Sequence, residues 1–340
     1  MTAPLINRQV ILSSRPEGIP EPRHFHLVES PVAAVEVGQL RVRNLYLSVD
    51  PAMRGWVNAA ANYSDPVSIG SVMRSFATGR VEESRHQQFK PGDFVTGLFG
   101  WQEYAIVSAD SARAVTEIDL PLSTSLGVLG LNGLTAFAGL LEVGRPKPGE
   151  TVVVSTAAGA VGSLVGQLAK LNGCRAVGIA GGASKVALCL SEFRFDQAID
   201  YKAGDLEGAL AAACPDGVDV YFDNTSGAIS DVVVRRLNLG ARVVVCGTAS
   251  IARWDPLPQG PRIERILLTR RASMHGLLAL DYEHKRPAAM RLLATGIRNG
   301  SIRYREEILE GLEEAPGAIA RLYRGENMGK LLIRLPTTES

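Results

Sequence analysis

The sequence predicts an α/β protein of two domains, one of them built on a doubly wound parallel sheet. Residues 151–170 read TVVVSTAAGAVGSLVGQLAK, an apolar β-branched run that passes through a small-residue turn into a helical pattern. Further strand patterns at 176–179, 218–222 and 242–246 alternate with helical stretches, as parallel sheets require. The length of 340 residues suits about two domains.

The first domain, residues 1–125, is predicted to be β-rich and barrel-like. Residues 39–49 alternate polar and apolar side chains, which is typical of a half-buried strand. A Pro-Gly-Asp turn at 91–93 precedes another strand, and residues 102–107 continue as a further one. Short strands joined by tight turns therefore characterise this part of the chain.

The second domain is expected to span residues 126–310, and residues 311–340 to return to the first. Residues 134–141 form a helix candidate, which Pro146, Pro148 and Gly149 end. After the second strand of the alternating region, Lys185 is expected to open a helix. The last 30 residues hold a helical stretch at 315–323 and an apolar strand at 330–335.

Composition narrows the function classes. The chain carries 36 basic and 35 acidic residues, so no strong field favours nucleic acid or a membrane surface as a partner. No apolar run reaches the roughly 18 residues that span a bilayer, and the first ten residues lack the apolar core of a signal peptide. The dispersed cysteines are typical of thiols in a reducing cytoplasm: Cys174, Cys189, Cys214 and Cys246.

The small-residue turn is a candidate dinucleotide site. Against the pattern G-x-G-x-x-G the chain offers Ala157, Gly159 and Gly162, with alanine in place of the first glycine. The preceding strand and the following helix strengthen the motif, because they direct backbone N–H groups and a positive helix end at one spot that suits a pyrophosphate. The alternative is a glycine-rich packing site between helix and sheet without a ligand.

The next strand favours NADP over NAD. NAD sites place Asp or Glu at the end of the second strand to hold the ribose 2′-hydroxyl. No carboxylate occurs between Ala176 and Lys185. Lys185 is placed to meet an added 2′-phosphate, and Tyr201 could supply a hydroxyl donor. The alternative for Lys185 is an ordinary solvated helix lysine.

With these residues in hand, the chain resembles the zinc-independent medium-chain dehydrogenase/reductases. The branch it resembles most contains prostaglandin reductase, plant alkenal double-bond reductases and bacterial curcumin reductase. The resemblance covers nearly the whole chain. It rests on NLYLSVDPAMRGW, IGSVM at 69–73, GWQEY at 100–104, LGLNGLTAFAGL at 129–140, VVVSTAAGAVGS, AIDYK, DNTSG, VVCG and the terminal GENMGK.

The resemblance implies a GroES-like β-barrel catalytic domain, a Rossmann NADP-binding domain, NADP(H), no metal, and a homodimer. It implies reduction of the carbon–carbon double bond of α,β-unsaturated ketones or aldehydes, with a small hydrophobic carbonyl compound as substrate. The residues expected to meet the cofactor are Gly159, Ala160, Val161, Gly162, Ser163, Gly181, Lys185, Tyr201, Asn224, Cys246, Gly247, Thr248, Leu277, Leu278, Ala279 and Asn327.

Two tyrosines that the family often has are missing. Ala52 stands in the DPYMR motif, and Ala252 falls at or near the tyrosine that follows the Cys-Gly turn. A roomier or more apolar pocket is expected, with Met53, Trp56 and Trp254 as wall candidates.

The candidate catalytic residues are therefore Tyr63, as the side chain nearest the substrate oxygen, and Arg54. For Tyr63 the alternative is packing on the barrel rim. For Arg54 it is an ion pair with Asp50. Tyr282 is a weaker candidate for the donor.

No zinc site is expected, because zinc needs cysteine, histidine or carboxylate ligands brought together. The catalytic half offers His24, His26 and His86 but no cysteine. Two other functions stay open. One is an NADPH quinone reductase, which shares the architecture. The other is an NADPH-binding sensor or structural protein with little catalysis, which the two missing tyrosines would fit.

Overall fold

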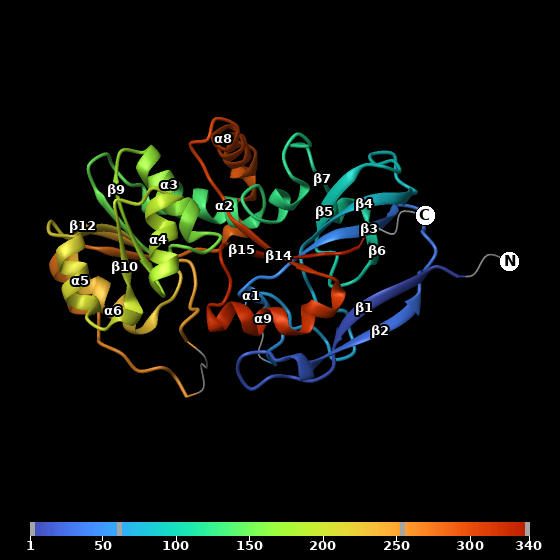
Figure 1. Ribbon diagram of the computed structural model, residues 1–340, viewed down its shortest axis with the longest axis horizontal. Helices are drawn as coiled ribbons and strands as arrows, with labels where there is room; N and C mark the ends of the chain where they lie inside the picture. The colour runs from blue at the N-terminus through green and yellow to red at the C-terminus, as the bar shows by residue number, and fades with distance from the viewer. Residues whose placement is uncertain (1–3, 60–62, 252–255, 337–340) are drawn as a thin grey trace. The chain divides into compact units, whose positions relative to one another are not determined.

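The computed structural model describes residues 4–59, 63–251 and 256–336 (Figure 1). The chain divides into two compact units. The first combines the chain up to Leu126 with the part from Glu306 onward, and the second is Gly127–Arg305. Residues 306–310, which we expected in the second domain, belong to the first unit, because they form a strand that pairs with the terminal strand.

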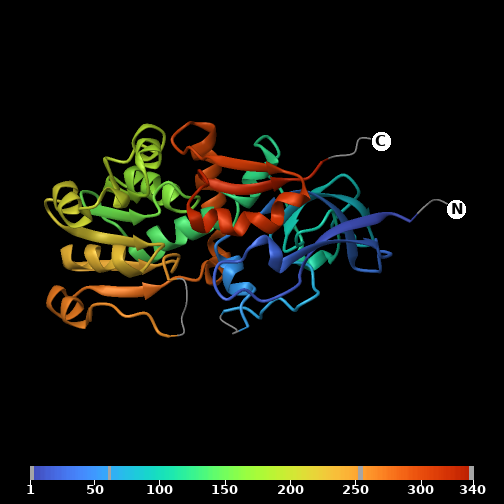
Figure 2. The ribbon, with the colours of Figure 1, turned by 60° about the horizontal axis from the view of Figure 1, so that its bottom comes forward.

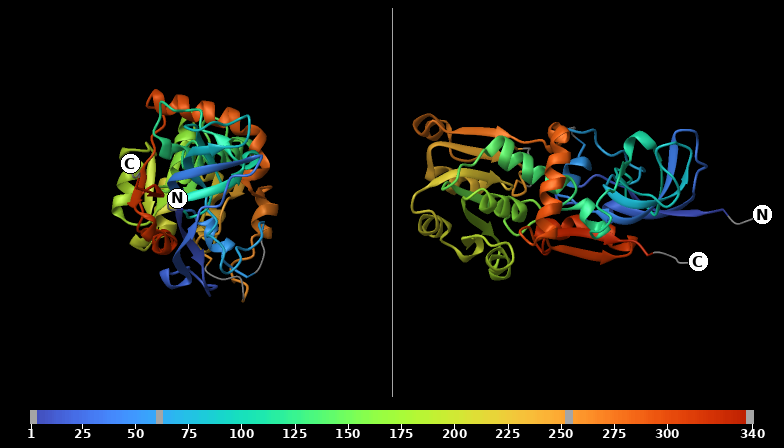
Figure 3. Two further views of the ribbon diagram at one scale, coloured as in Figure 1. Left: turned by 90° about the vertical axis from the view of Figure 1, so that its right-hand side faces the viewer. Right: turned by 90° about the horizontal axis from the view of Figure 1, so that it is seen from above.

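The second unit contains a six-stranded parallel sheet in the order β10-β9-β8-β11-β12-β13. Figure 3 shows β12 and β13, yellow and orange, side by side at one edge. The bounds of its strands are β8 Thr151–Ser155, β9 Arg175–Ala180, β10 Gln197–Asp200, β11 Val218–Asp223, β12 Leu237–Val245 and β13 Ser273–Gly276.

Helices surround this sheet, as the alternating sequence pattern predicts. On one face of the sheet, a buried cluster contains Val153, Val177 and Tyr221 from the strands together with side chains from α5, α6 and α7. Helix α3 contacts β8 and β9. The helices are α2 Leu131–Phe137, α3 Gly162–Leu171, α4 Ala183–Ser191, α5 Leu206–Ala213, α6 Gly227–Val233, α7 Glu264–Arg270 and α8 Arg286–Arg298.

Two helix predictions needed adjustment. The helix expected at 134–141 begins earlier, at Leu131, and continues from residue 138 to Gly144 as a π-helical segment. Helix α4 begins at Ala183 rather than at Lys185, because the strand before it ends at Ala180 and only two glycines separate them.

The first unit is a mixed sheet in the order β14-β15-β3-β4-β5-β7, with β6 also pairing to β3, beside a two-stranded sheet of β1 and β2. Strand β3 pairs with β4 along one edge and with both β6 and β15 along the other. The strands are β1 Ile6–Leu12, β2 Phe25–Pro31, β3 Gln39–Ser48, β4 Ala77–Ser84, β5 Phe94–Gly97, β6 Tyr104–Ser108, β7 Arg113–Ala114, β14 Glu306–Glu310 and β15 Lys330–Arg334.

The end of the chain completes this first unit. Strand β15 pairs antiparallel with β3, as expected of the terminal strand. It also pairs parallel with β14, and Figure 2 shows these two red strands side by side. Leu331 and Ile333 are fully buried among core side chains from β3 and β4. The helices of this unit are α1 Ala52–Trp56 and α9 Ala315–Arg324. In the part of the chain that the structure describes, no helix is long and apolar enough to cross a membrane.

A buried ion pair ties the two ends of this unit together. The ammonium of Lys330, 4% exposed, donates to Asp50 Oδ1 at 2.6 Å, to Ser48 Oγ at 2.7 Å and to the Val49 carbonyl at 3.0 Å. All three ammonium protons thus have acceptors at the last residue of β3 and in the two residues that follow it. Removal of one partner would leave the other as an uncompensated charge in the core.

Replacing Lys330 with methionine should lower the free energy of unfolding by about 3 kcal/mol, because Asp50 then loses its cation inside the protein. Urea denaturation followed by the fluorescence of Trp101, which lies in the same core, measures the change. The matched control is Arg334→Met on the same strand, where an exposed pair with Glu310 should cost about 1 kcal/mol or less. Equal losses in the two variants would contradict a special role for the buried pair.

Candidate cofactor and active site

Because the strands of the second sheet are parallel, the predicted cofactor residues come together at the carboxyl ends of these strands. Each of the strands β8 to β13 ends there, and the segments that follow them start with Thr156, Gly181, Tyr201, Asn224 and Cys246, in chain order. The segment from Leu277 to Ala279 follows β13 at the same edge. Crevices at the carboxyl ends of parallel strands are the usual ligand sites of such sheets.

The turn after β8 is shaped for close approach of a ligand to the backbone. Thr156 has a positive φ of 54°, which reverses the chain directly after the strand. A Cβ on Gly162 would lie 2.3 Å from the Thr156 carbonyl oxygen, so only glycine fits where α3 begins. The amide of Ser163 donates to the Gly159 carbonyl at 3.0 Å.

The start of α3 has no side-chain cap, since Val161 occupies the N-cap position. The first N–H groups of a helix have no acceptor within the helix, and the peptide dipoles add a positive end there. Because Ala160 and Val161 are small or apolar, the backbone remains the polar surface of this turn. The turn fits a pyrophosphate, as its sequence predicts.

The segments after β9 and β10 meet. A Cβ on Gly181 would lie 2.9 Å from Cε1 and 3.0 Å from the hydroxyl oxygen of Tyr201, so the tyrosine ring lies against the Gly181 backbone. Lys185 is in the first turn of α4, whose N-cap is Gly182 and which also has no side-chain cap. The structure therefore gathers Gly181, Lys185 and Tyr201 around the end of β9.

Asp200 holds these two segments together, a role that sequence reasoning missed. Its Oδ1 accepts the N–H of Gly182 at 2.8 Å and the N–H of Lys202 at 2.9 Å. These backbone hydrogen bonds hold the pKa of the Asp200 carboxyl below its usual range. Both of these donors are backbone N–H groups, one from the segment after β9 and one from the segment after β10.

The segment after β11 is organised by a buried carboxylate. Oδ1 of Asp223, 1% exposed, accepts the hydroxyl of Tyr221 at 2.9 Å and the amides of Thr225 and Ser226, each at 2.9 Å. Burial, together with the Asp223 charge, raises the pKa of the Tyr221 hydroxyl well above its usual value. Tyr221 is thus a neutral donor that holds the carboxylate in place.

Asn224 is fixed against the end of β8. Its backbone N–H donates to Ser155 Oγ at 2.8 Å and its side-chain amide donates to the Ser155 carbonyl at 2.7 Å. The backbone N–H groups of Cys246 and Gly247 donate to the Asp223 carbonyl at 2.8 and 3.1 Å. Hydrogen bonds therefore join the segments after β8, β11 and β12, and Thr248 continues the last of them.

The Cys246 thiol is not a nucleophile in this setting. Burial, with a further contribution from the Asp223 charge, raises its pKa to about 12. At neutral pH the group is the protonated thiol, and the thiolate is the reactive form. Cys246 therefore contributes shape and backbone position to the site.

The segment after β13 lies next to the π-helical segment that follows α2. The N–H of Leu277 donates to the Val245 carbonyl at 2.9 Å, and the Leu277 side chain would lie 2.6 Å from a Cβ on Gly139. Leu278 and Ala279 follow, the latter 7% exposed. Asn327 is in the first unit, where its amide donates to the Gly329 carbonyl at 2.8 Å. Contact of these residues with a cofactor stays a prediction.

The catalytic candidates lie in the first unit, near residues that sequence reasoning missed. The guanidinium of Arg54, 8% exposed, lies 4.3 Å from the centre of the Tyr323 ring, and the Tyr323 hydroxyl donates to the Pro51 carbonyl at 2.8 Å. Burial raises the pKa of Tyr323 to about 12. Tyr323 therefore supports both Arg54 and the start of α1. No sequence pattern pairs residues 269 positions apart.

Tyr63 is 56% exposed, in keeping with a side chain that reaches a substrate. Arg74 anchors the residues that follow Tyr63, because its guanidinium donates to Ser64 Oγ at 3.3 Å and to the Asp65 carbonyl at 2.9 Å. The same guanidinium lies 5.7 Å from the Trp56 ring centre. Tyr63 is thus an exposed phenol next to a fixed segment.

The other pocket candidates turned out differently. Met53 and Trp56 are buried in the core of the first unit, at 0% and 6% exposure, so the expectation that they form pocket walls finds no support there. Ala252 and Trp254 lie outside the described residues. Tyr282 stacks on His284, with ring centres 6.2 Å apart.

Ligands for a metal are not brought together in the described parts of the chain, where no three histidine, cysteine or acidic side chains gather. The cysteines Cys174, Cys189, Cys214 and Cys246 all belong to the second unit and form no disulfide. His24 in the first unit is 7% exposed and its ring Nδ1 bonds with the backbone of Glu21. The donor set does not fit a zinc ion.

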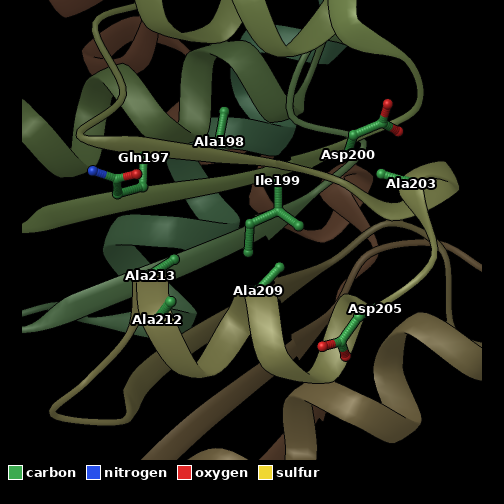
Figure 4. Close-up of a pocket in the computed structure, with 9 residues that line it drawn as sticks. All are labelled: Gln197, Ala198, Ile199, Asp200, Ala203, Asp205, Ala209, Ala212 and Ala213. Atoms are coloured by element: carbon green, nitrogen blue, oxygen red, sulfur yellow. The ribbon is translucent and has the colours of Figure 1, made fainter.

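A cavity of about 470 Å³ opens between strand β10 and helix α5 (Figure 4). Asp200, Ala203 and Asp205 lie at one of its ends and Gln197, Ala212 and Ala213 at the other. Its lining is mostly alanine and contains no lysine or arginine that could pair with a phosphate. The cavity runs along β10, the edge strand of the described sheet, and the turn after β8 does not line it.

Comparison with known proteins assigns the family. A family model described as "N-terminal domain of oxidoreductase" matches residues 8–115, and one described as "Zinc-binding dehydrogenase" matches residues 160–295. NADPH-dependent curcumin reductase of Escherichia coli is 43% identical over 334 residues, which cover 97% of each chain. The chain belongs to the medium-chain dehydrogenase/reductase family.

Other members of the family agree. The NADP-dependent 2-alkenal reductase of Nicotiana tabacum is 39% identical over 98% of each chain. The crystal structure of CurA from Vibrio vulnificus in complex with NADPH is 40% identical, has a TM-score of 0.93 and covers 97% of this chain and 99% of that chain. The chain thus belongs to the curcumin, alkenal and prostaglandin reductase branch of the medium-chain dehydrogenase/reductases.

Replacing Gly162 with alanine should weaken the binding of NADPH at least tenfold, because the new Cβ must push the Thr156 carbonyl away and displace the start of α3. Titration with NADPH, followed by the fluorescence of the reduced nicotinamide, measures this. Gly18→Ala is the matched control, since no atom lies within 4 Å of its added Cβ. Unchanged affinity in the Gly162 variant would contradict the assignment of the turn as the pyrophosphate site.

Proposed function

We propose that the chain is an NADPH-dependent reductase of the carbon–carbon double bond of α,β-unsaturated ketones or aldehydes. The supporting observation is the end of β9, where the Tyr201 ring lies against Gly181, Lys185 lies in the first turn of the helix that follows, and the carboxylate typical of NAD sites is missing. The cofactor named for the curcumin reductase and for the CurA structure is NADPH, and the tobacco relative is named an alkenal reductase.

Bound NADPH would supply a hydride to the β-carbon of the substrate. Negative charge then builds up on the carbonyl oxygen, and a donor directed at that oxygen stabilises it. The protein binds the pyrophosphate at the turn from Gly159 to Ser163 and the 2′-phosphate at Lys185 and Tyr201. The ribose and nicotinamide are bordered by four further parts of the chain: Asn224, the segment from Cys246 to Thr248, the segment from Leu277 to Ala279, and Asn327.

For the substrate oxygen we propose Tyr63 as the nearest side chain, with Arg54 orienting substrate or cofactor. Tyr63 is an exposed phenol on a segment that Arg74 holds. Arg54 is held in place by the Tyr323 ring. Ala52 stands at one place where the family often has a tyrosine, whereas Tyr63 remains at another such place. A positioned acid or water protonates the α-carbon afterwards.

We also propose a cytoplasmic homodimer with a small hydrophobic carbonyl compound as substrate. Strand β13 ends the described sheet, so its outer edge offers backbone groups that a second copy can pair with. The four cysteines are free thiols, which suits a reducing compartment. Light scattering should give about twice the chain mass of 36.3 kDa, and a monomer mass would exclude the dimer.

Oxidation of NADPH should be fastest with a medium-chain enal or a benzylidene ketone, and the product should be the saturated carbonyl compound. Absorbance of NADPH together with mass spectrometry of the product measures this. A small quinone serves as the competing substrate. Formation of semiquinone with no reduction of either enone would favour a quinone reductase, and tight binding of NADPH without turnover would favour a sensor or structural protein.

Replacing Tyr63 with phenylalanine should lower kcat for the enone about tenfold or more while leaving the affinity for NADPH within twofold, because the phenol acts on the developing oxyanion. Steady-state kinetics and a cofactor titration check the two quantities. Tyr46→Phe on β3 is the control tyrosine variant and should retain wild-type kcat. An unchanged kcat in the Tyr63 variant would transfer the donor role to another group.

A further inference from the structure

We propose that Lys202 is a second cation for the 2′-phosphate of the cofactor and thereby helps to determine the preference for NADPH over NADH. The inference rests on the proposed function, since it assigns a residue within the site for that cofactor. No carboxylate among the described residues forms an ion pair with this lysine. Its ammonium is therefore available to a ligand.

The position of Lys202 follows from packing at Gly181. A Cβ on Gly181 would lie 3.1 Å from Cε of Lys202 and 3.0 Å from the hydroxyl oxygen of Tyr201. The lysine arm therefore runs from the end of β10 back to the end of β9. Its last methylene lies beside the same backbone as the tyrosine hydroxyl, so the ammonium, one bond further, is in the neighbourhood assigned to the 2′-phosphate.

Asp200 fixes this arrangement from the backbone. Its Oδ1 accepts the N–H of Gly182 at 2.8 Å and the N–H of Lys202 at 2.9 Å. One carboxylate oxygen thus holds both the turn that begins α4 and the backbone of Lys202. Lys202 itself lies in the short 3₁₀ turn Tyr201–Ala203. The two lysines thus belong to different segments, Lys185 to the first turn of α4 and Lys202 to the turn after β10.

The charge balance requires more than one lysine. A phosphate monoester carries about −1.5 to −2 charges at pH 7. Asp200 adds a further negative charge at the end of β10, and its charge is compensated only in part by backbone donors. Lys185 alone supplies one positive charge, and the start of α4 about half of one. With Lys202 the positive charge comes close in size to the combined negative charge of the phosphate and Asp200.

The experiment compares two probes that differ in the 2′-phosphate alone, 2′,5′-ADP and 5′-AMP, by calorimetry on the full chain. In Lys202→Met, which keeps the apolar arm, the Kd of 2′,5′-ADP should rise about tenfold and that of 5′-AMP less than twofold. Lys202→Arg should stay within about threefold of wild type for both. Lys147→Met, an exposed lysine ahead of β8 at the opposite edge of the sheet, is the control and should change neither.

A second readout separates charge from structure. The Kd of 2′,5′-ADP should depend less steeply on salt concentration in Lys202→Met than in wild type, because one ion contact is lost. A Kd for 2′,5′-ADP that stays at the wild-type value, or equal weakening of both probes, would overturn the role of Lys202 while leaving NADPH as the cofactor. If the wild-type chain fails to prefer 2′,5′-ADP over 5′-AMP, the proposed cofactor and the role of Lys202 fall together.

Discussion

The common direction of the strands in the second unit is the constraint on which the site depends. Six parallel strands end at one edge, and each delivers a short segment of different chemistry there. Parallel pairing makes this a consequence of topology, because each helix carries the chain back before the next strand begins. A reversed strand would remove its segment from the group. The alternating strand and helix pattern in the sequence is thus what makes a shared site possible.

Backbone hydrogen bonds to two carboxylates then turn these separate segments into one surface. Asp223 collects donors from the segment after its own strand, and Asn224 reaches across to the end of β8. Asp200 accepts backbone N–H groups from the turn before α4 and from the 3₁₀ turn after β10, and so joins these two segments. Both carboxylates sit directly at the last position of a strand. In each case the side chain that shapes the site is not itself expected to touch the substrate.

Features could be predicted from the sequence where the residues that form them lie close together along the chain. The glycine turn after β8 is encoded within a dozen residues, so strand, turn and helix start were predicted together, and Lys185 and Tyr201 were placed relative to them. The hydrogen bonds of Asp200 with Gly182 and the stacking of Arg54 on Tyr323 join segments distant along the chain. Neither contact corresponds to a periodic pattern or a motif in the sequence. Burial of Met53 likewise depends on the packing of the core of the first unit, and its place in a pocket wall stays a prediction.

The discontinuity of the first unit has a consequence for synthesis. The second unit is contiguous and lies between the two parts of the first, so β15 and Lys330 become available to Asp50 only after residues 127–305 have been translated. The nascent N-terminal part therefore holds an acidic group and an open strand edge that nothing yet covers. The first sheet can therefore be completed only after the second unit has been synthesised, when Lys330 supplies the cation for Asp50.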